Sequence, residues 1–76
     1  MKSVTILLDT IEKVRKFVNQ IATYEGDFDI ISDRYIIDAK SIMGIFSLDL
    51  SKPLKLQIHD ENAAAKIAEE FKEFIV

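Results

Sequence analysis

The chain has 76 residues, enough for one domain, and folding at this size hides only roughly 60% of the surface of the unfolded chain. Ten basic residues are scattered among thirteen acidic ones, and the net charge of −3 argues against nucleic acid or an anionic membrane as the main partner. The chain contains no cysteine and one histidine, which excludes disulfides and both thiolate and multi-histidine metal sites. We therefore expect no metal and no cofactor.

No stretch of the sequence approaches the roughly 20 apolar residues that a transmembrane helix needs, and the N-terminus has no signal-like apolar run. We expect one soluble, cytoplasmic domain over residues 1–76, without repeats or linkers. Every element of so short a chain must contribute to the hydrophobic core.

The first third of the chain predicts a strand and a helix. Residues 3–8 alternate in polarity, which indicates a strand with one buried face. Asp9 or Thr10 then caps a helix that we expect to run to Gly26. Asp9 and Glu12 also have the spacing of a capping box. Six apolar residues at helical spacing form the expected buried side of this helix: Ile11, Val14, Phe17, Val18, Ile21 and Tyr24.

Two short strands follow this helix. Residues 27–32 predict a strand with Phe28 and Ile30 facing inward. Residues 35–37 predict a third strand after a tight polar turn.

The last third of the chain predicts a strand and a helix, after a loop in which Pro53 prevents any helix from continuing. Residues 54–59 alternate apolar and polar side chains and predict the fourth strand. Asp60 caps the final helix, and its expected buried side comprises Ala64, Ile67, Ala68, Phe71, Phe74 and Ile75. The element order is thus βαββαβα. One sheet covered on one side by helices is the simplest way to bury such single-faced strands.

Residues 38–48 contain more large apolar side chains than a short helix can bury. Ser41 is suited to open a helix, because its hydroxyl can accept a hydrogen bond from a free N–H of the first turn. Ile45 and Leu48 can share one buried face. We expect other apolar side chains here to face water, as at a docking surface, unless the next loop covers them.

Residues 40–48, KSIMGIFSL, carry a resemblance to a known family. The segment resembles the regulatory-serine segment of HPr, the histidine-containing phosphocarrier of the bacterial sugar phosphotransferase system. Element order and length extend the resemblance over nearly the whole chain. It implies an α+β fold, the open-faced HPr sandwich, in which helices cover one face of a four-stranded antiparallel or mixed sheet. It also implies that the fourth strand lies between the first two.

The chain lacks the residue that gives this family its name. HPr carries a phosphoryl group on a histidine at the start of its first helix, followed by Ala, Arg and Pro. Counting back from Lys40 without gaps puts Thr10 at the place of the histidine and Glu12 at that of the arginine. A carboxylate there repels phosphate. His59 would lie roughly 15–20 Å away, at the end of the fourth strand.

We therefore interpret Thr10 as a helix cap, and His59 as a surface histidine or a helper at a helix cap. We expect no catalytic residue, no enzyme activity and no phosphotransfer on histidine. The regulatory segment remains. Ser41 falls at the serine that a regulatory kinase phosphorylates in HPr of low-GC Gram-positive bacteria, and its alternative role is that of a helix cap alone.

Four residues match the positions through which HPr docks enzyme I, sugar permeases and a transcriptional regulator: Lys40, Ile42, Met43 and Phe46. The retained segment around Ser41 favours an HPr-like regulatory or protein-docking module, whose partners would be phosphotransferase-system components, an HPr kinase or a transcriptional regulator. Two other interpretations stay open. One is a phosphocarrier with an unorthodox acceptor residue, and the other is a small-molecule-binding regulatory domain of similar element order.

Overall fold

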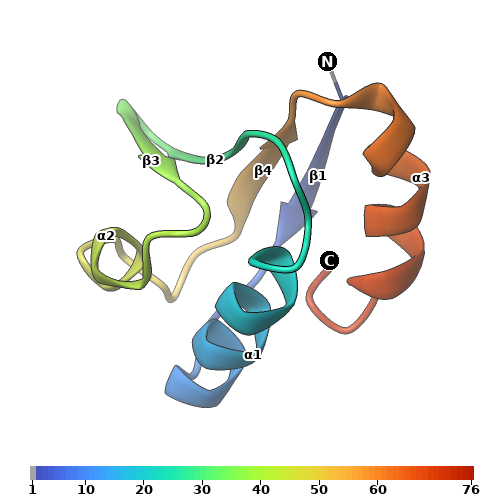
Figure 1. Cartoon of the computed structure of the whole chain (residues 1–76). Coiled ribbons are helices and arrows are strands. Elements are labelled where there is room, and N and C mark those ends of the chain that lie inside the picture. The colour runs from blue at the N-terminus through green and yellow to red at the C-terminus, as the bar shows by residue number, and fades with distance from the viewer. Residues whose placement is uncertain (1) are drawn as a thin grey trace.

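A computed structural model describes residues 2–76 of the chain and confirms the predicted α+β architecture and element order (Figure 1). Over these residues the strands are β1 (Lys2–Ile6), β2 (Phe28–Ser32), β3 (Tyr35–Asp38) and β4 (Leu54–Ile58), and the helices are α1 (Ile11–Ile21), α2 (Ile42–Phe46) and α3 (Glu61–Glu70). No helix in this part of the chain is both long and apolar enough to cross a membrane.

The strands form one antiparallel sheet in the order β1-β4-β2-β3. The fourth strand therefore lies between the first two, as the resemblance implied. Helix α3 lies on the β1 side of the sheet and α2 on the β3 side (Figure 1). Strands β1 and β3 form the two edges. The C-terminus covers part of the β1 edge, because Ile75 pairs with Ile6 and the N–H of Val76 donates to the carbonyl oxygen of Thr5 at 3.0 Å.

One face of the sheet is buried, because apolar residues on adjacent strands stand directly opposite one another. Val4 and Ile30 both lie opposite Leu56, and Ile30 also lies opposite Ile37. Ile30 and Leu56 are fully buried in this row. On the other face, Lys55 lies opposite both Thr5 and Ile31, and polar side chains predominate. The period-two alternation in the sequence thus predicted correctly which side chains enter the core.

Helix α1 begins where expected and ends earlier. Thr10 is the N-cap, so the predicted capping box of Asp9 and Glu12 is not the arrangement that forms. The helix ends at Ile21 rather than at Gly26, because the N–H groups that follow make three-residue turns, such as Tyr24 to the carbonyl of Ile21 at 3.1 Å.

The predicted buried side of α1 is correct except at its first residue. Val14, Phe17 and Ile21 are fully buried, and Val18 packs against the core. Ile11 was expected inside, yet 62% of its surface is exposed. A residue in the first turn can keep the helical spacing and still extend past the elements that the helix packs against.

Helix α3 is shorter than its apolar pattern indicated. Asp60 caps it as predicted, but the helix ends at Glu70 and turns follow. Phe71 and Phe74 are buried as expected, although they lie in these turns. The prediction of Ala68 on the buried side was wrong, because Ala68 is exposed.

Aromatic contacts hold α1 and the C-terminal turns together beneath the sheet. The ring of Phe17 meets those of Phe71 and Phe74 edge-on, with centroids 5.5 and 5.7 Å apart. Edge-to-face geometry is the favoured arrangement for aromatic pairs. The hydroxyl of Tyr24 also donates to the carboxylate of Glu70, which joins the end of α1 to the end of α3.

Candidate functional site

The start of α1 is organised as an ordinary helix cap. Thr10 has extended backbone angles, and its hydroxyl oxygen accepts the backbone N–H of Lys13 at 3.1 Å. The ammonium group of Lys13 lies 3.0 Å from a carboxylate oxygen of Asp9. Glu12 adds a negative charge in the first turn. The cap thus binds the N–H of Lys13, and Asp9 and Lys13 compensate each other's charge.

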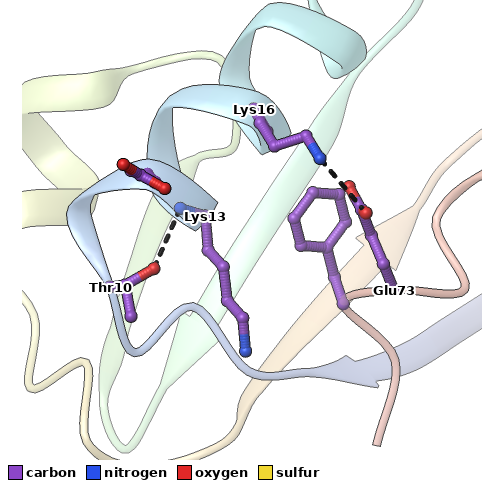
Figure 2. A pocket seen from close by; sticks show the side chains of 6 residues that line it. Thr10, Lys13, Lys16 and Glu73 are labelled. Carbon is purple, nitrogen blue, oxygen red and sulfur yellow. Dashed lines mark hydrogen bonds and ion pairs between the residues drawn. The ribbon is translucent and has the colours of Figure 1, made fainter.

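A cleft of about 240 Å³ lies beside this cap, between α1 and the turns that follow α3 (Figure 2). Its lining comprises Thr10, Glu12, Lys13, Lys16, Glu73 and Phe74. Lys16 forms an ion pair with Glu73 at 3.3 Å, and the two side chains point toward each other in Figure 2. Two lysines and two glutamates leave the lining without an excess of positive charge to attract a phosphate.

The only histidine of the sequence lies at the other end of the sheet. His59 follows Ile58, which pairs with Lys2 at the start of β1, whereas Thr10 follows the end of β1. The ring nitrogen Nε2 of His59 lies 2.7 Å from a carboxylate oxygen of Asp29, on the face of the sheet that no helix covers. His59 is thus a surface histidine, and its partner is a strand residue instead of the cap of α3.

Helix α2 is built on Ser41, as the sequence predicted. Ser41 has extended backbone angles, and its hydroxyl oxygen accepts the N–H of Gly44 at 3.2 Å. Gly44 is also required by packing, because a Cβ atom there would lie 2.5 Å from a methyl carbon of Ile37. The absence of a side chain at Gly44 therefore lets α2 approach β3 closely.

The apolar residues of α2 divide between the core and the surface. Ile45 is fully buried, and Ile42 and Leu48 are half-buried against the core. Met43 is 78% exposed and Phe46 is 41% exposed. We call Met43 and Phe46 the α2 patch. The loop after α2 leaves both side chains accessible, and an exposed pair of large apolar groups is the kind of feature that contacts other proteins.

Lys40 and Ile11 lie differently from what the sequence pattern suggested. The ammonium group of the half-buried Lys40 is bound to backbone carbonyl groups, 2.6 Å from the oxygen of Tyr24 and 3.2 Å from that of Gly26. Ile11, which the sequence analysis placed in the core, instead adds an exposed apolar side chain at the start of α1, the helix that packs against α2. The position of Ile11 directly after the cap residue Thr10 was the available signal.

Comparison with known proteins supports the fold. No protein-family model and no curated protein matches the chain. Among solved structures, the chain is similar to HPr-C-His from Thermoanaerobacter tengcongensis, with 28% sequence identity and a TM-score of 0.70. The alignment covers 91% of this chain and 89% of that one. The chain therefore has an HPr-like fold, which the resemblance of residues 40–48 had implied.

Proposed function

We propose that this protein is a docking module related to the phosphoenolpyruvate-dependent sugar phosphotransferase system, and that it does not carry phosphate on a histidine. The HPr-like fold supports the connection to this system. The exposed α2 patch next to the Ser41 cap is the observation that carries the docking role. Its partners are then phosphotransferase-system proteins, an HPr kinase or a transcriptional regulator.

The residues at the start of α1 support the second half of this proposal. The ungapped count back from Lys40 puts Thr10 where the family has its histidine, and the hydroxyl of Thr10 accepts a backbone N–H. A threonine phosphate would be an ester, which is too stable to donate its phosphoryl group quickly. Lys13 and Lys16 each lie beside a carboxylate, whose negative charge opposes that of a phosphoryl group. The contacts at the start of α1 stabilise the helix and do not favour phosphoryl transfer.

The phosphotransfer part can be tested directly with purified enzyme I and labelled phosphoenolpyruvate. We expect no gain of phosphate in the intact mass, whereas an HPr that carries the histidine becomes labelled in the same mixture. An acid-labile phosphate that disappears in Thr10→Ala or in His59→Ala would overturn this part of the proposal and identify an unorthodox acceptor.

The docking part can be tested by titrating the protein with enzyme I, a sugar permease domain, HPr kinase and the transcriptional regulator. Met43→Ser and Phe46→Ser should each weaken binding about tenfold or more, as for residues at the centre of an interface. Val76→Ser is the matched control, because Val76 is also apolar and exposed but lies beside the β1 edge of the sheet. Equal losses in all three variants, or no binding by the wild-type protein, would contradict the role of the α2 patch.

Each variant must also be shown to be folded. Met43→Ser should change the free energy of unfolding by no more than about 0.5 kcal/mol, as at other surface positions. Phe46 is more covered, so Phe46→Ser should cost roughly 1 kcal/mol. Ile45→Ala, at the buried position between them, should cost about 2–5 kcal/mol. This order of stabilities separates a loss of contact from a loss of fold.

A further inference from the structure

We infer that the free edge of β3 is a self-association site, at which a second copy of this chain adds its own β3 in antiparallel orientation. This inference is independent of the docking role of α2. β3 is the last strand of the sheet, and no strand lies beyond it in the part of the chain that the structure describes. Its side chains Tyr35 and Ile36 are 62% and 69% exposed. An uncovered edge with apolar side chains readily pairs with another strand.

The hydrogen-bonding pattern identifies which residue of β3 faces the open edge. The N–H of Ala39 donates to the carbonyl oxygen of Phe28 at 2.8 Å, which makes these two residues a hydrogen-bonded pair. Such pairs alternate along an antiparallel ladder. Ile37 and Tyr35 therefore point their backbone groups toward β2. Ile36, which lies between them, points its N–H and its C=O away from the sheet.

If the two copies are related by a two-fold axis at Ile36, the outward backbone groups of Ile36 gain hydrogen-bond partners and the nearby charges gain opposite charges. Ile36 of each copy would exchange two backbone hydrogen bonds with Ile36 of the other. The uncovered faces of the two sheets would then lie on the same side of the joined sheet. In this register Arg34 of one copy lies opposite Asp38 of the other, and symmetry repeats the pair. Cross-strand pairs of opposite charge stabilise such contacts.

The charges within one copy are suited to such a partner. Asp38 lies directly opposite Asp29 on β2. Asp29 has the ring of His59 at 2.7 Å, whereas the carboxylate of Asp38 accepts the backbone N–H of Lys40 at 2.9 Å and makes no ion pair within the described residues. Arg34, in the exposed turn before β3, makes no ion pair with any other residue among 2–76. An arginine from the second copy would give Asp38 a cationic partner. Shifting the register by two residues would instead place Asp38 opposite Ile36 and lose both ion pairs.

The contact is small, since β3 has four residues, so the dimer should be weak and should form at roughly 0.1–1 mM protein. Sedimentation velocity and translational diffusion over this range would detect it. We expect the wild-type protein to associate reversibly and to dissociate at high salt. A protein that stays monomeric over the whole range at low salt would overturn the inference.

A mixing experiment tests the register. Arg34→Glu places two acidic residues opposite each other in its homodimer, and Asp38→Lys places two basic residues opposite each other, so each variant alone should associate about tenfold more weakly. An equimolar mixture makes both pairs attractive again and should restore association. Arg15→Glu and Glu25→Lys carry the same charge changes at exposed positions away from β3 and serve as the matched control mixture.

The outcomes separate the alternatives. Restoration in the first mixture beyond that in the control mixture supports pairing through β3, and equal behaviour of the two mixtures overturns it. Loss of the dimer in Phe46→Ser without loss in Arg34→Glu would place the contact on the α2 patch and overturn it as well. Each variant is first shown to melt as the wild type does. Should Asp38→Lys fail this check, Ile36→Lys is measured alone, because two lysines facing each other at the axis must also prevent association, and unchanged association in Ile36→Lys overturns the inference.

Discussion

The ammonium group of Lys40 lies 2.6 Å from the carbonyl oxygen of Tyr24, just beyond the end of α1. It also lies 3.2 Å from the carbonyl oxygen of Gly26 and 5.6 Å from the centre of the ring of Phe28. Through these contacts the ammonium group of Lys40 links the start of α2 to the segment that follows α1. Lys40 was predicted as a docking residue, and a partner would have to displace these carbonyl groups to reach its charge.

Lys40→Met should therefore destabilise the fold. Hydrogen bonds to a charged group contribute about 1.5–3 kcal/mol, and each kcal/mol lowers the melting temperature of so small a domain by about 4–8 °C. Urea and thermal unfolding would measure the loss. Lys52→Met is the control, because Lys52 is exposed and its ion pair with Asp49 is 3.9 Å long. Equal stability of the two variants would mean that the Lys40 contacts contribute little.

The fold was predictable because its signals are local. Leu54, Leu56 and Ile58 alternate with polar residues, and all three are buried. Helix ends were less predictable, since contacts far along the chain decide them. Phe71 and Phe74 continue the helical spacing of α3, yet the carbonyl oxygen of Phe74 accepts the N–H of Leu7 at 2.8 Å and the chain turns there.

The site was predicted in outline only. Residues 40–48 indicated a cap at Ser41 and exposed apolar groups behind it, and Met43 and Phe46 are indeed exposed. The pattern could not indicate that Lys40 binds carbonyl groups 14 and 16 residues earlier in the chain. It could not indicate the exposure of Ile11 either, because periodicity records spacing along a helix and not where the neighbouring element ends.

Gly44 provides a test of how closely α2 packs against β3. Gly44→Ala should destabilise the protein by about 1–3 kcal/mol, because the new methyl group would meet Ile37, although alanine favours helix by about 1 kcal/mol. In a double-mutant cycle, Gly44→Ala should cost clearly less when Ile37→Ala has already removed the conflicting methyl group. Additive losses in urea unfolding would show that the two positions do not conflict.

Asp49, in the loop after α2, should give a measurable pH effect. The hydroxyl of Ser51 donates to its carboxylate at 2.6 Å and the backbone N–H of Ser51 at 3.1 Å, and these bonds hold the pKa of Asp49 below its ordinary 3.8. A lowered pKa in the folded state stabilises the fold above the unfolded pKa, and this contribution is lost as the pH falls through the folded pKa.

Ser51→Ala removes the larger of these effects, so the pKa of Asp49 should rise toward 3.8 in a carboxyl NMR titration. The backbone hydrogen bond should keep the pKa from reaching the full value. Ser47→Ala is the control, because the hydroxyl of Ser47 donates to the carbonyl oxygen of Gly44 and not to Asp49. An unchanged pKa in Ser51→Ala would assign the shift to the backbone bond alone.

Phosphorylation of Ser41 should lower the free energy of unfolding of the protein only a little. The hydroxyl oxygen that accepts the N–H of Gly44 would carry the phosphate, which brings about −1.5 to −2 charges to the start of a helix, where negative charge is favoured. Ser41→Ala, which removes the cap altogether, should cost about 1 kcal/mol. The phosphorylated protein should therefore melt at or above the temperature of Ser41→Ala.

Phosphorylation of Ser41 should change the affinity for partners much more than it changes the free energy of unfolding. Met43 lies two residues after Ser41, so a partner that buries this side chain must also desolvate the phosphate unless it supplies arginines to pair with it. The ammonium group of Lys40 is held by the carbonyl oxygens of Tyr24 and Gly26. It would have to leave these oxygens before it could neutralise the phosphate. Phosphorylation should thus remove partners with an apolar surface and admit partners with a basic one.

The experiment is to treat the protein with a bifunctional HPr kinase, to map the phosphate by mass spectrometry and to compare partner titrations with those of Ser41→Ala. Met43→Ser is the second comparison, because it weakens apolar contacts without adding charge. Binding that falls in the phosphorylated form and persists in Ser41→Ala would establish the switch. If Ser41 receives no phosphate, or if the phosphorylated form melts several degrees lower than Ser41→Ala, the serine acts only as the cap of α2.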